Sequence, residues 1–132
     1  MIQIVLYKND YLGGNMGLFD LVGNSLKKHG ALNISLKEAT SVAPNDMGCY
    51  KIYCGGLKYV GKAEDGIRKR FVQYYNGTTK HYTSGRKIYE NKEKITVTWQ
   101  VCKSREEVRS LEAKWIKELD PKWNVQSGWG GY

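Results

Sequence analysis

The chain has 132 residues, of which 41% are hydrophobic and 12% aromatic, and this composition excludes a disordered protein. The length predicts one domain, because it allows one substantial hydrophobic core but not two. Twenty-one Lys and Arg against 13 Asp and Glu give a formal net charge of +8, which favours a polyanionic partner over the alternative of a soluble basic surface without a partner.

The first third of the chain predicts structure rather than chemistry. Residues 1–7 alternate weakly and predict an edge strand. Residues 17–28 place leucines and a valine at helical spacing and predict an amphipathic helix. Ser35 and Glu38 form a capping box, which predicts a short helix that ends before Pro44. The alternative for this region is a DNA-contacting or dimerising role for a basic cluster: Lys27, Lys28 and His29.

The N-terminus and the cysteines indicate the compartment. The first ten residues lack a basic segment followed by a long apolar one, so we expect no signal peptide. No apolar run approaches the ~20 residues of a membrane helix, so we expect no membrane partner. Cys49, Cys54 and Cys102 are odd in number and lack the spacing of zinc ligands. Free thiols predict the reducing environment of the cytoplasm.

The stretch 48–70 combines a hairpin with the start of a helix. Residues of high strand propensity lead to a turn at Gly55 and Gly56, and a second short run, 57–60, follows. From residue 67 the apolar spacing becomes helical. Cations that hold a phosphodiester and phenols that move a proton gather in this short segment. The residues concerned are Tyr50, Tyr59, Lys62, Arg70 and Tyr74.

Residues 77–94 are rich in basic side chains interleaved with tyrosines. Cations contact phosphates and aromatic rings stack on bases, so this segment favours a nucleic-acid surface over an ordinary solvated loop. Its principal candidates are Lys80, His81, Arg86 and Lys87. The following run, 94–103, alternates cleanly and predicts a half-buried strand, the third of an antiparallel sheet with the hairpin. Its inward side chains are predicted to be Ile95, Val97, Trp99 and Val101.

The last predicted helix carries one informative carboxylate. Ser104 and Glu107 form a second capping box, and Pro121 ends the helix. Its apolar stripe contains Val108, Leu111, Trp115, Ile116 and Leu119. Glu112 lies in or at the edge of this stripe, where a carboxylate is costly unless it is paired or binds a cation. A hydrogen bond to a nearby Arg or Tyr is the alternative to a metal ion.

Two tripeptides carry a family resemblance. GCY at 48–50 and YVG at 59–61 resemble the paired motifs of the GIY-YIG nuclease superfamily, and the following GKAED and RKRF resemble their continuation in the bacterial excision-repair nuclease and in small stand-alone enzymes. The resemblance extends in the family's order to Asn124. The chain departs from the pattern in three ways. Cys49 replaces an aliphatic residue, a short hairpin makes Tyr53 a competitor of Tyr50, and an extra Gly66 makes Arg68 a competitor of Arg70.

The resemblance implies an α+β fold with a small three-stranded antiparallel sheet flanked by helices. It also implies a DNA endonuclease that depends on Mg²⁺ or Mn²⁺ and leaves 5′-phosphate and 3′-hydroxyl ends. In this scheme Tyr59 is the base, Tyr50 orients the water or shares its proton, and Glu112 holds the metal. The remaining members of the implied site act on the phosphate or support these groups: Lys62, Arg70, Tyr74 and Asn124. Lys62 and Arg70 would also contact DNA.

We divide the chain into an N-terminal extension (1–47), a nuclease core (48–124) and a glycine-rich aromatic tail (125–132) within one domain. A catalytically inactive member of the same fold that binds nucleic acid is the alternative, and an unrelated basic interaction domain is a third interpretation. One metal and one phosphate clamp predict a monomer that nicks DNA, with a dimer as the alternative.

Overall fold

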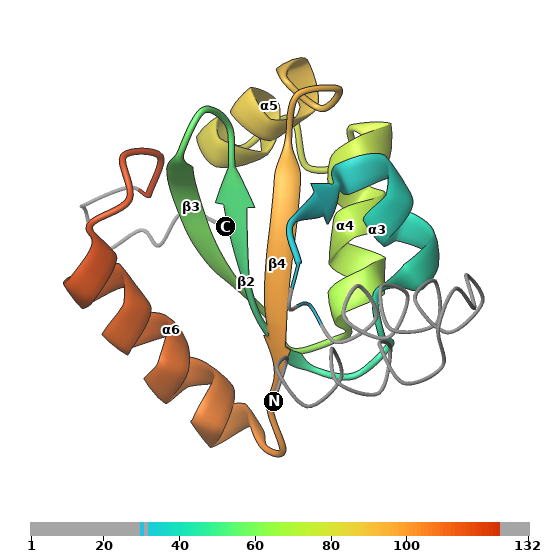
Figure 1. Cartoon of the computed structure of the whole chain (residues 1–132). Coiled ribbons are helices and arrows are strands. Elements are labelled where there is room, and N and C mark those ends of the chain that lie inside the picture. Colours follow the sequence, from blue (N-terminus) through green and yellow to red (C-terminus); the bar gives the residue numbers. More distant parts are fainter. Residues whose placement is uncertain (1–29, 31, 125–132) are drawn as a thin grey trace, which may run out of the picture.

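The computed structural model describes residue 30 and residues 32–124. The predicted strand at 1–7, the predicted helix at 17–28 and the tail at 125–132 lie outside the described residues. Within the described part, four antiparallel strands form one sheet with helices on both sides (Figure 1). None of the described helices is long and apolar enough to cross a membrane. The predicted α+β class is confirmed.

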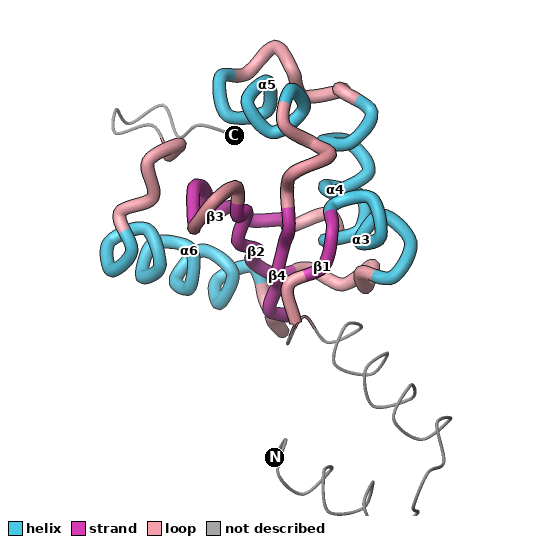
Figure 2. The backbone as a smooth tube through the Cα atoms, turned by 45° about the horizontal axis from the view of Figure 1, so that its top comes forward, coloured by secondary structure: helices cyan, strands magenta, loops and turns pink. Residues whose placement is uncertain are grey.

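The sheet has one strand more than the sequence analysis predicted. Its strands are β1 (Ile34–Ser35), β2 (Gly48–Tyr53), β3 (Leu57–Ala63) and β4 (Thr96–Val101), in the order β1-β4-β2-β3. The predicted pairing of β4 with the hairpin is correct, but the prediction of three strands is wrong. The additional strand, β1, pairs with β4 just before a helix begins (Figure 2). Two residues are too few to show an alternating pattern, so the sequence alone does not reveal this strand.

Four helices flank the sheet: α3 (Leu36–Val42), α4 (Ile67–Asn76), α5 (Thr83–Glu90) and α6 (Arg105–Leu119). Both predicted capping serines begin helices. The N–H of Glu38 donates to Ser35 Oγ at 3.0 Å, and the N–H of Glu107 donates to Ser104 Oγ at 3.1 Å. Helices α3 and α4 lie on one side of the sheet and α6 lies on the other (Figures 1 and 2).

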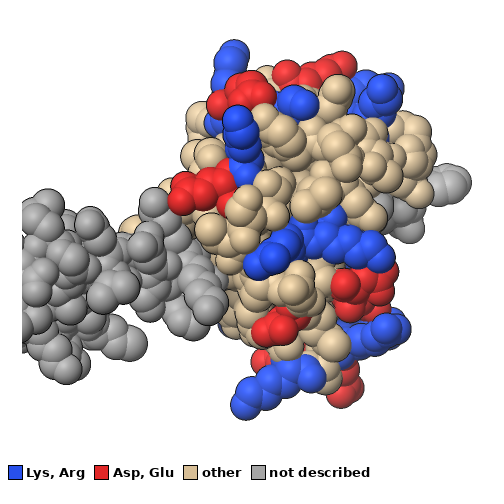
Figure 3. Space-filling view, turned by 90° about the vertical axis from the view of Figure 1, so that its right-hand side faces the viewer, with Lys and Arg blue, Asp and Glu red and all other residues tan. Residues whose placement is uncertain are grey.

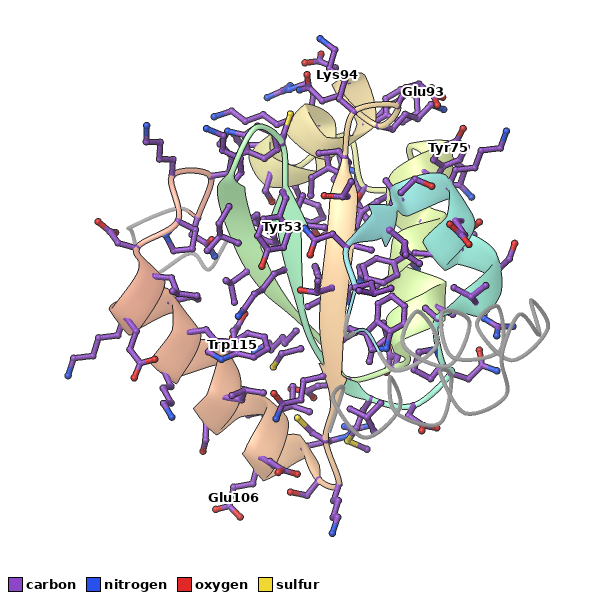
Figure 4. All side chains as sticks on the ribbon, in the orientation of Figure 1. Tyr53, Tyr75, Glu93, Lys94, Glu106 and Trp115 are labelled. Atoms are coloured by element: carbon purple, nitrogen blue, oxygen red, sulfur yellow. The ribbon has the colours of Figure 1, made fainter. Side chains whose placement is uncertain are left out.

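Alternation along β2 divides the hydrophobic interior in two. Tyr50 and Ile52 point into the larger core beneath α3 and α4, whereas Cys49 and Lys51 point toward α6. Cys49 Sγ donates to the carbonyl of Val108, and Lys51 Nζ lies 4.3 Å from the centre of the Trp115 ring, which points from α6 toward the sheet (Figure 4). The sheet therefore separates a larger core on the side of α3 and α4 from a smaller one on the side of α6, and β2 contributes side chains to both.

Two predicted apolar faces are less buried than expected. On α6 only Val108 is fully buried, while Leu111, Trp115 and Ile116 are half-buried and Leu119 is 41% exposed. The core beneath α6 is small, consisting of Cys49, Cys102 and Val108 with a few partly buried neighbours, so it does not cover the whole stripe. On β4 the last predicted inward residue, Val101, is 44% exposed because it ends the strand.

The absence of a side chain at Gly61 lets Tyr50 pack across β3. Gly61 is the cross-strand partner of Tyr50, and a Cβ at Gly61 would lie 2.3 Å from both Cζ and the hydroxyl oxygen of Tyr50. Such a separation is well inside van der Waals contact. The glycine of the YVG motif thus makes room for the tyrosine of the GCY motif.

We predict that Gly61→Ala destabilises the protein by about 1–3 kcal/mol, because overpacking a buried site displaces the ring of Tyr50. The measurement is denaturant unfolding followed by fluorescence. Lys58→Ala on the same strand is the control, and its expected change is within about 0.5 kcal/mol. Equal unfolding midpoints for Gly61→Ala and the wild type would contradict the packing argument.

Candidate active site

Three tyrosines from three elements meet beside β3. Tyr50 of β2 and Tyr74 of α4 share a hydrogen bond between their hydroxyls, 2.5 Å long. The ring of Tyr59, on β3, has its centre 6.3 Å from that of Tyr50. All three side chains are buried: Tyr50 and Tyr74 are 0% exposed and Tyr59 is 3% exposed. The structure thus brings together the three phenols that the sequence analysis selected.

The competition between Tyr50 and Tyr53 is decided by the alternation of β2. Tyr50 points toward α4, where its ring packs edge-on against those of Phe71 and Tyr74. Tyr53 is only half-buried, lies at the end of the strand and pairs with Leu57 and Thr96 (Figure 4). Of the two, only Tyr50 belongs to the tyrosine cluster.

Arg70 and Arg68 point to different places. Arg68 Nε donates to the carbonyl of Ala43 at 2.7 Å and so joins the start of α4 to the end of α3. Arg70 Nη1 donates to the carbonyl of Lys62 at 3.0 Å, which places the guanidinium at the edge of β3. Its positive charge lowers the pKa of Tyr50, Tyr59 and Tyr74. Of the two arginines, only Arg70 reaches the strand that carries Tyr59.

Lys62 and Glu112 face each other on the α6 side of β3. Lys62 Nζ lies 4.0 Å from Glu112 Oε1, and the Glu112 side chain is 22% exposed. Burial raises the pKa of Glu112, and the nearby charge of Glu64 raises it further, while Lys62 and Arg70 lower it. The carboxylate is thus only partly compensated by the cations around it.

The phenol of Tyr59 is a weak acid in this environment. Burial raises its pKa to about 12, and the charge of Glu112 adds to this effect. Ser84, Tyr74 and Arg70 act in the opposite direction. Burial also raises the pKa of Tyr50 and of Tyr74 above the ordinary value of 10.0. Proton transfer at Tyr59 therefore needs positive charge in addition to the groups present here.

Asn124 occupies the outer edge of β3. Its Nδ2 donates to the carbonyl of Val60 at 2.9 Å, and its Oδ1 accepts from the N–H of Val60 at 3.0 Å. The neighbouring N–H of Trp123 donates to the carbonyl of Lys58 at 2.7 Å. Both polar atoms of the Asn124 amide are thus bound to the residue that follows Tyr59.

The nucleic-acid residues predicted within 77–94 lie on α5 and in the turn before it, whereas Lys62 and Arg70 lie on β3 and α4. Lys80, His81, Arg86 and Lys87 are all exposed. Lys87 Nζ lies 5.9 Å from the centre of the Trp123 ring, which connects α5 with the segment that covers the edge of β3. The face that carries α3 and α4, by contrast, mixes Lys and Arg with Asp and Glu and has no large area of one sign (Figure 3).

Two residues of the site were not selected from the sequence. Glu64 follows β3 directly, pairs with Arg109 at 3.0 Å and with Arg105 at 3.9 Å, and acts electrostatically on Glu112. It belongs to the GKAED segment, whose resemblance to the family motif could have identified it from the sequence. Ser84 is 1% exposed and lowers the pKa of Tyr59. No periodicity or motif marks it.

The site offers a divalent cation one carboxylate. Within residue 30 and residues 32–124, no group of three or more His, Cys, Asp or Glu side chains is placed to hold a metal ion together. Mg²⁺ keeps several of its waters and is often held by one or two carboxylates, so a single half-buried, undercompensated Glu112 is compatible with it. The residues present therefore fit a hydrated ion.

Comparisons with known proteins show which family the chain resembles. A family model described as the GIY-YIG catalytic domain matches residues 46–125. UvrABC system protein C of Rhodococcus jostii (strain RHA1) is 34% identical over 92 residues, which cover 68% of this chain and 12% of that protein. The same-named protein of Mycobacterium leprae (strain TN) is 32% identical over 92 residues, 68% of this chain and 14% of that protein. The matched region is thus a small part of each relative.

Solved structures give the same result. The GIY-YIG N-terminal endonuclease domain of UvrC from Thermotoga maritima, bound to magnesium as its catalytic divalent cation, superposes with a TM-score of 0.57 at 28% identity. The superposition covers 68% of this chain and 96% of that domain.

We predict that Glu112→Gln stabilises the protein at neutral pH. A carboxyl group whose pKa is raised on folding weakens the fold as the pH rises above its ordinary value of 4.5, and glutamine removes this penalty. The free energy of unfolding, measured by denaturant titration, is expected to exceed that of the wild type at neutral pH and to match it at a pH below 4.5. Glu106→Gln, on the exposed face of the same helix, is the control. A loss of stability at neutral pH would mean that the pair with Lys62 outweighs the burial of Glu112.

Proposed function

Because the chain belongs to the GIY-YIG family, with a match over residues 46–125, we propose that it is a DNA endonuclease that requires Mg²⁺ or Mn²⁺ and leaves 5′-phosphate and 3′-hydroxyl ends. One observation carries this proposal: the buried phenols, the guanidinium of Arg70 and the Lys62–Glu112 pair meet at one edge strand. A protein that only binds nucleic acid needs basic residues but not a half-buried carboxylate beside buried phenols. The completeness of the set therefore favours catalysis.

Glu112 is the residue proposed to hold the metal. The bound ion would supply positive charge that stabilises the leaving 3′ oxygen and favours ionisation of groups nearby. The ammonium group of Lys62 lies 4.0 Å from the Glu112 carboxylate and partly neutralises its negative charge. The solved UvrC domain that resembles this chain is bound to magnesium, which supports the choice of ion.

Tyr59 is proposed to act as the base. Its phenolate takes a proton from the attacking water, and the resulting hydroxide forms a bond to phosphorus. The bond from phosphorus to the 3′ oxygen breaks, and that oxygen takes a proton from solvent to become the 3′-hydroxyl. Tyr74 shares its short hydroxyl contact with Tyr50, and it also lowers the pKa of Tyr59. Tyr50 is fully buried, so in place of the role at the water that the resemblance implies we propose that it holds Tyr74 in position.

Arg70 and Asn124 complete the proposed scheme in different ways. The guanidinium of Arg70 neutralises the attacked phosphate, where a cation stabilises the charge that grows in the transition state. Asn124 binds both backbone groups of Val60 and so fixes the strand that carries Tyr59. DNA would approach along the exposed cations of α5 and its preceding turn, Lys80, His81, Arg86 and Lys87, together with Lys62 and Arg70.

We predict that Glu112→Gln loses cleavage but keeps DNA binding, because it removes the proposed metal ligand and leaves the basic surface intact. The measurement is nicking of supercoiled plasmid and cleavage of duplex, single-stranded, flapped and branched DNA, each with Mg²⁺ and with EDTA. The control is Glu106→Gln, which is expected to cleave like the wild type. A wild-type protein that cleaves equally well in EDTA would overturn the metal requirement, and one that cleaves none of these substrates would overturn the proposed function.

We predict that Arg70→Ala lowers the cleavage rate about 100- to 1,000-fold, as expected for loss of a group that stabilises transition-state charge. Arg68→Ala is the matched control on the same helix. Its loss leaves the carbonyl of Ala43 without its donor, so it is expected to lower stability by about 1 kcal/mol with little effect on rate at temperatures where it is folded. The reverse pattern would exchange the two roles.

A further inference from the structure

Two aromatic rings stand together on the surface in the turn before α5. The ring centres of His81 and Tyr82 lie 4.2 Å apart, and the ring planes are tilted by 40°. Both residues are exposed, and the contacts that Tyr82 makes leave it 45% exposed, more than any other large hydrophobic residue that the structure describes. A single exposed aromatic residue needs no explanation, but two adjoining rings form a surface that a third ring can cover.

The backbone of this turn is fixed before any ligand arrives. The N–H of Tyr82 donates to the carbonyl of Thr79 at 3.1 Å, and the carbonyl of Tyr82 accepts from the N–H of Arg86 at 2.9 Å. The turn also packs closely on the helix that follows, because a Cβ at Gly85 would lie 2.1 Å from the carbonyl oxygen of Thr79. A ligand that stacks on the rings therefore orders little of the backbone, which lowers the entropy cost of binding.

Exposed cations flank the ring pair. Lys80 precedes it, Arg86 and Lys87 follow it on α5, and all three are exposed. Glu90, at the far end of α5, is the only acidic residue within the sequence of 77–90. Positive charge on both sides of exposed rings is complementary to a polyanion that carries rings of its own. A nucleic acid has this chemistry, since its phosphates bind cations while its bases stack on aromatic side chains.

The rings favour an unpaired strand over a duplex. Inside a duplex each base already stacks on the neighbouring base pairs, so its faces are covered and only the phosphates remain for the cations. An unpaired base exposes its faces and can stack on an aromatic side chain whatever its sequence. The cations would therefore bind either form of DNA, whereas the two rings would contribute only to the binding of unpaired nucleotides.

Helix α5 connects this surface to the candidate active site. Its buried residue Ile88 belongs to the same core as Tyr50 and Tyr74. Lys87 Nζ lies 5.9 Å from the centre of the Trp123 ring, and the N–H of Trp123 is bonded to β3. The ring pair thus stands at the start of a helix that packs against the elements of the site, at one end of the sheet (Figure 1).

We propose that the His81–Tyr82 ring pair is a stacking platform for an unpaired DNA base, with the neighbouring phosphates bound by Lys80, Arg86 and Lys87. The substrate class that follows is DNA with unpaired nucleotides beside the cleaved bond, as in a flap or a branch. This choice of cleavage substrate rests on the proposed function, whereas the binding of an unpaired base does not.

The test measures binding without cleavage. The full chain is titrated in EDTA with a fluorescent single-stranded oligothymidylate and with a duplex of the same length, and binding is followed by anisotropy. Tyr82→Ala is expected to weaken single-strand binding about tenfold, the loss of one base–aromatic stack, and to leave duplex binding within about twofold. Tyr82→Phe keeps the ring and is expected to restore single-strand binding. Leu119→Ala, which removes an exposed apolar side chain on α6, is the control.

The salt dependence of binding distinguishes the rings from the cations. Each phosphate contact with a single strand contributes about 0.7 to the slope of log affinity against log salt. Lys80→Ala is therefore expected to reduce that slope by about 0.7 and to weaken the binding of both single strand and duplex. Tyr82→Ala removes no charge, so its slope is expected to equal that of the wild type.

Cleavage of flapped DNA separates this proposal from the nuclease function. Tyr82→Ala is expected to raise KM about tenfold with kcat unchanged, because the groups proposed for the chemistry stay in place. Selective loss of single-strand binding in a protein that cleaves no DNA would support the platform and overturn the nuclease function. Wild-type single-strand affinity for Tyr82→Ala, an equal loss for single strand and duplex, or failure of Tyr82→Phe to restore binding would overturn the platform and leave the function in place.

Discussion

The outward edge of β3 is the constraint on which the rest of the structure depends. This strand ends the sheet, so every second backbone carbonyl points away from β2 and needs another donor. The carbonyls of Lys58, Val60 and Lys62 receive Trp123 N–H, Asn124 Nδ2 and Arg70 Nη1 in turn. Arg70 and Asn124, both selected for chemistry, therefore also donate hydrogen bonds to the carbonyls of this strand. The same hydrogen bonds that satisfy the edge of β3 also place residues of the site. They join residues 123 and 124, near the C-terminal end of the described chain, to the hairpin.

An edge strand also explains how one site draws on both faces of a sheet. Side chains of a strand alternate between faces, so Tyr59 and Lys62 of β3 belong to opposite sides. On a strand in the middle of a sheet, the neighbouring strands would keep the groups on the two faces apart. At the edge, groups from α4 and α6 act on each other across one strand, as the mutual influence of Arg70 and Glu112 indicates. The tyrosines lie in the large core and the carboxylate beside the small one.

Burial gives this site both its order and its chemical difficulty. The rings of Tyr50 and Tyr74 are as buried as any core residue, so their hydroxyls have defined positions. The same burial raises the pKa of each phenol and of Glu112, because charge is disfavoured away from water. The guanidinium of Arg70 at the strand edge offsets part of that cost, and the cation proposed at Glu112 would offset more of it.

The sequence by itself determined the family and the main elements. The motifs GCY and YVG, two capping serines and the alternation of β4 are local patterns, and local patterns follow from propensity and spacing. They also placed Glu112 beside the apolar stripe of its helix. Tertiary structure alone decided what depends on contacts between distant segments. The two-residue strand β1 forms only through its pairing with β4. Arg70 is distinguished from Arg68 by the carbonyl that each one reaches, and the position of Asn124 is defined only by its hydrogen bonds to β3. These contacts leave no periodic pattern in the sequence, because they depend on which surfaces meet once the chain has folded.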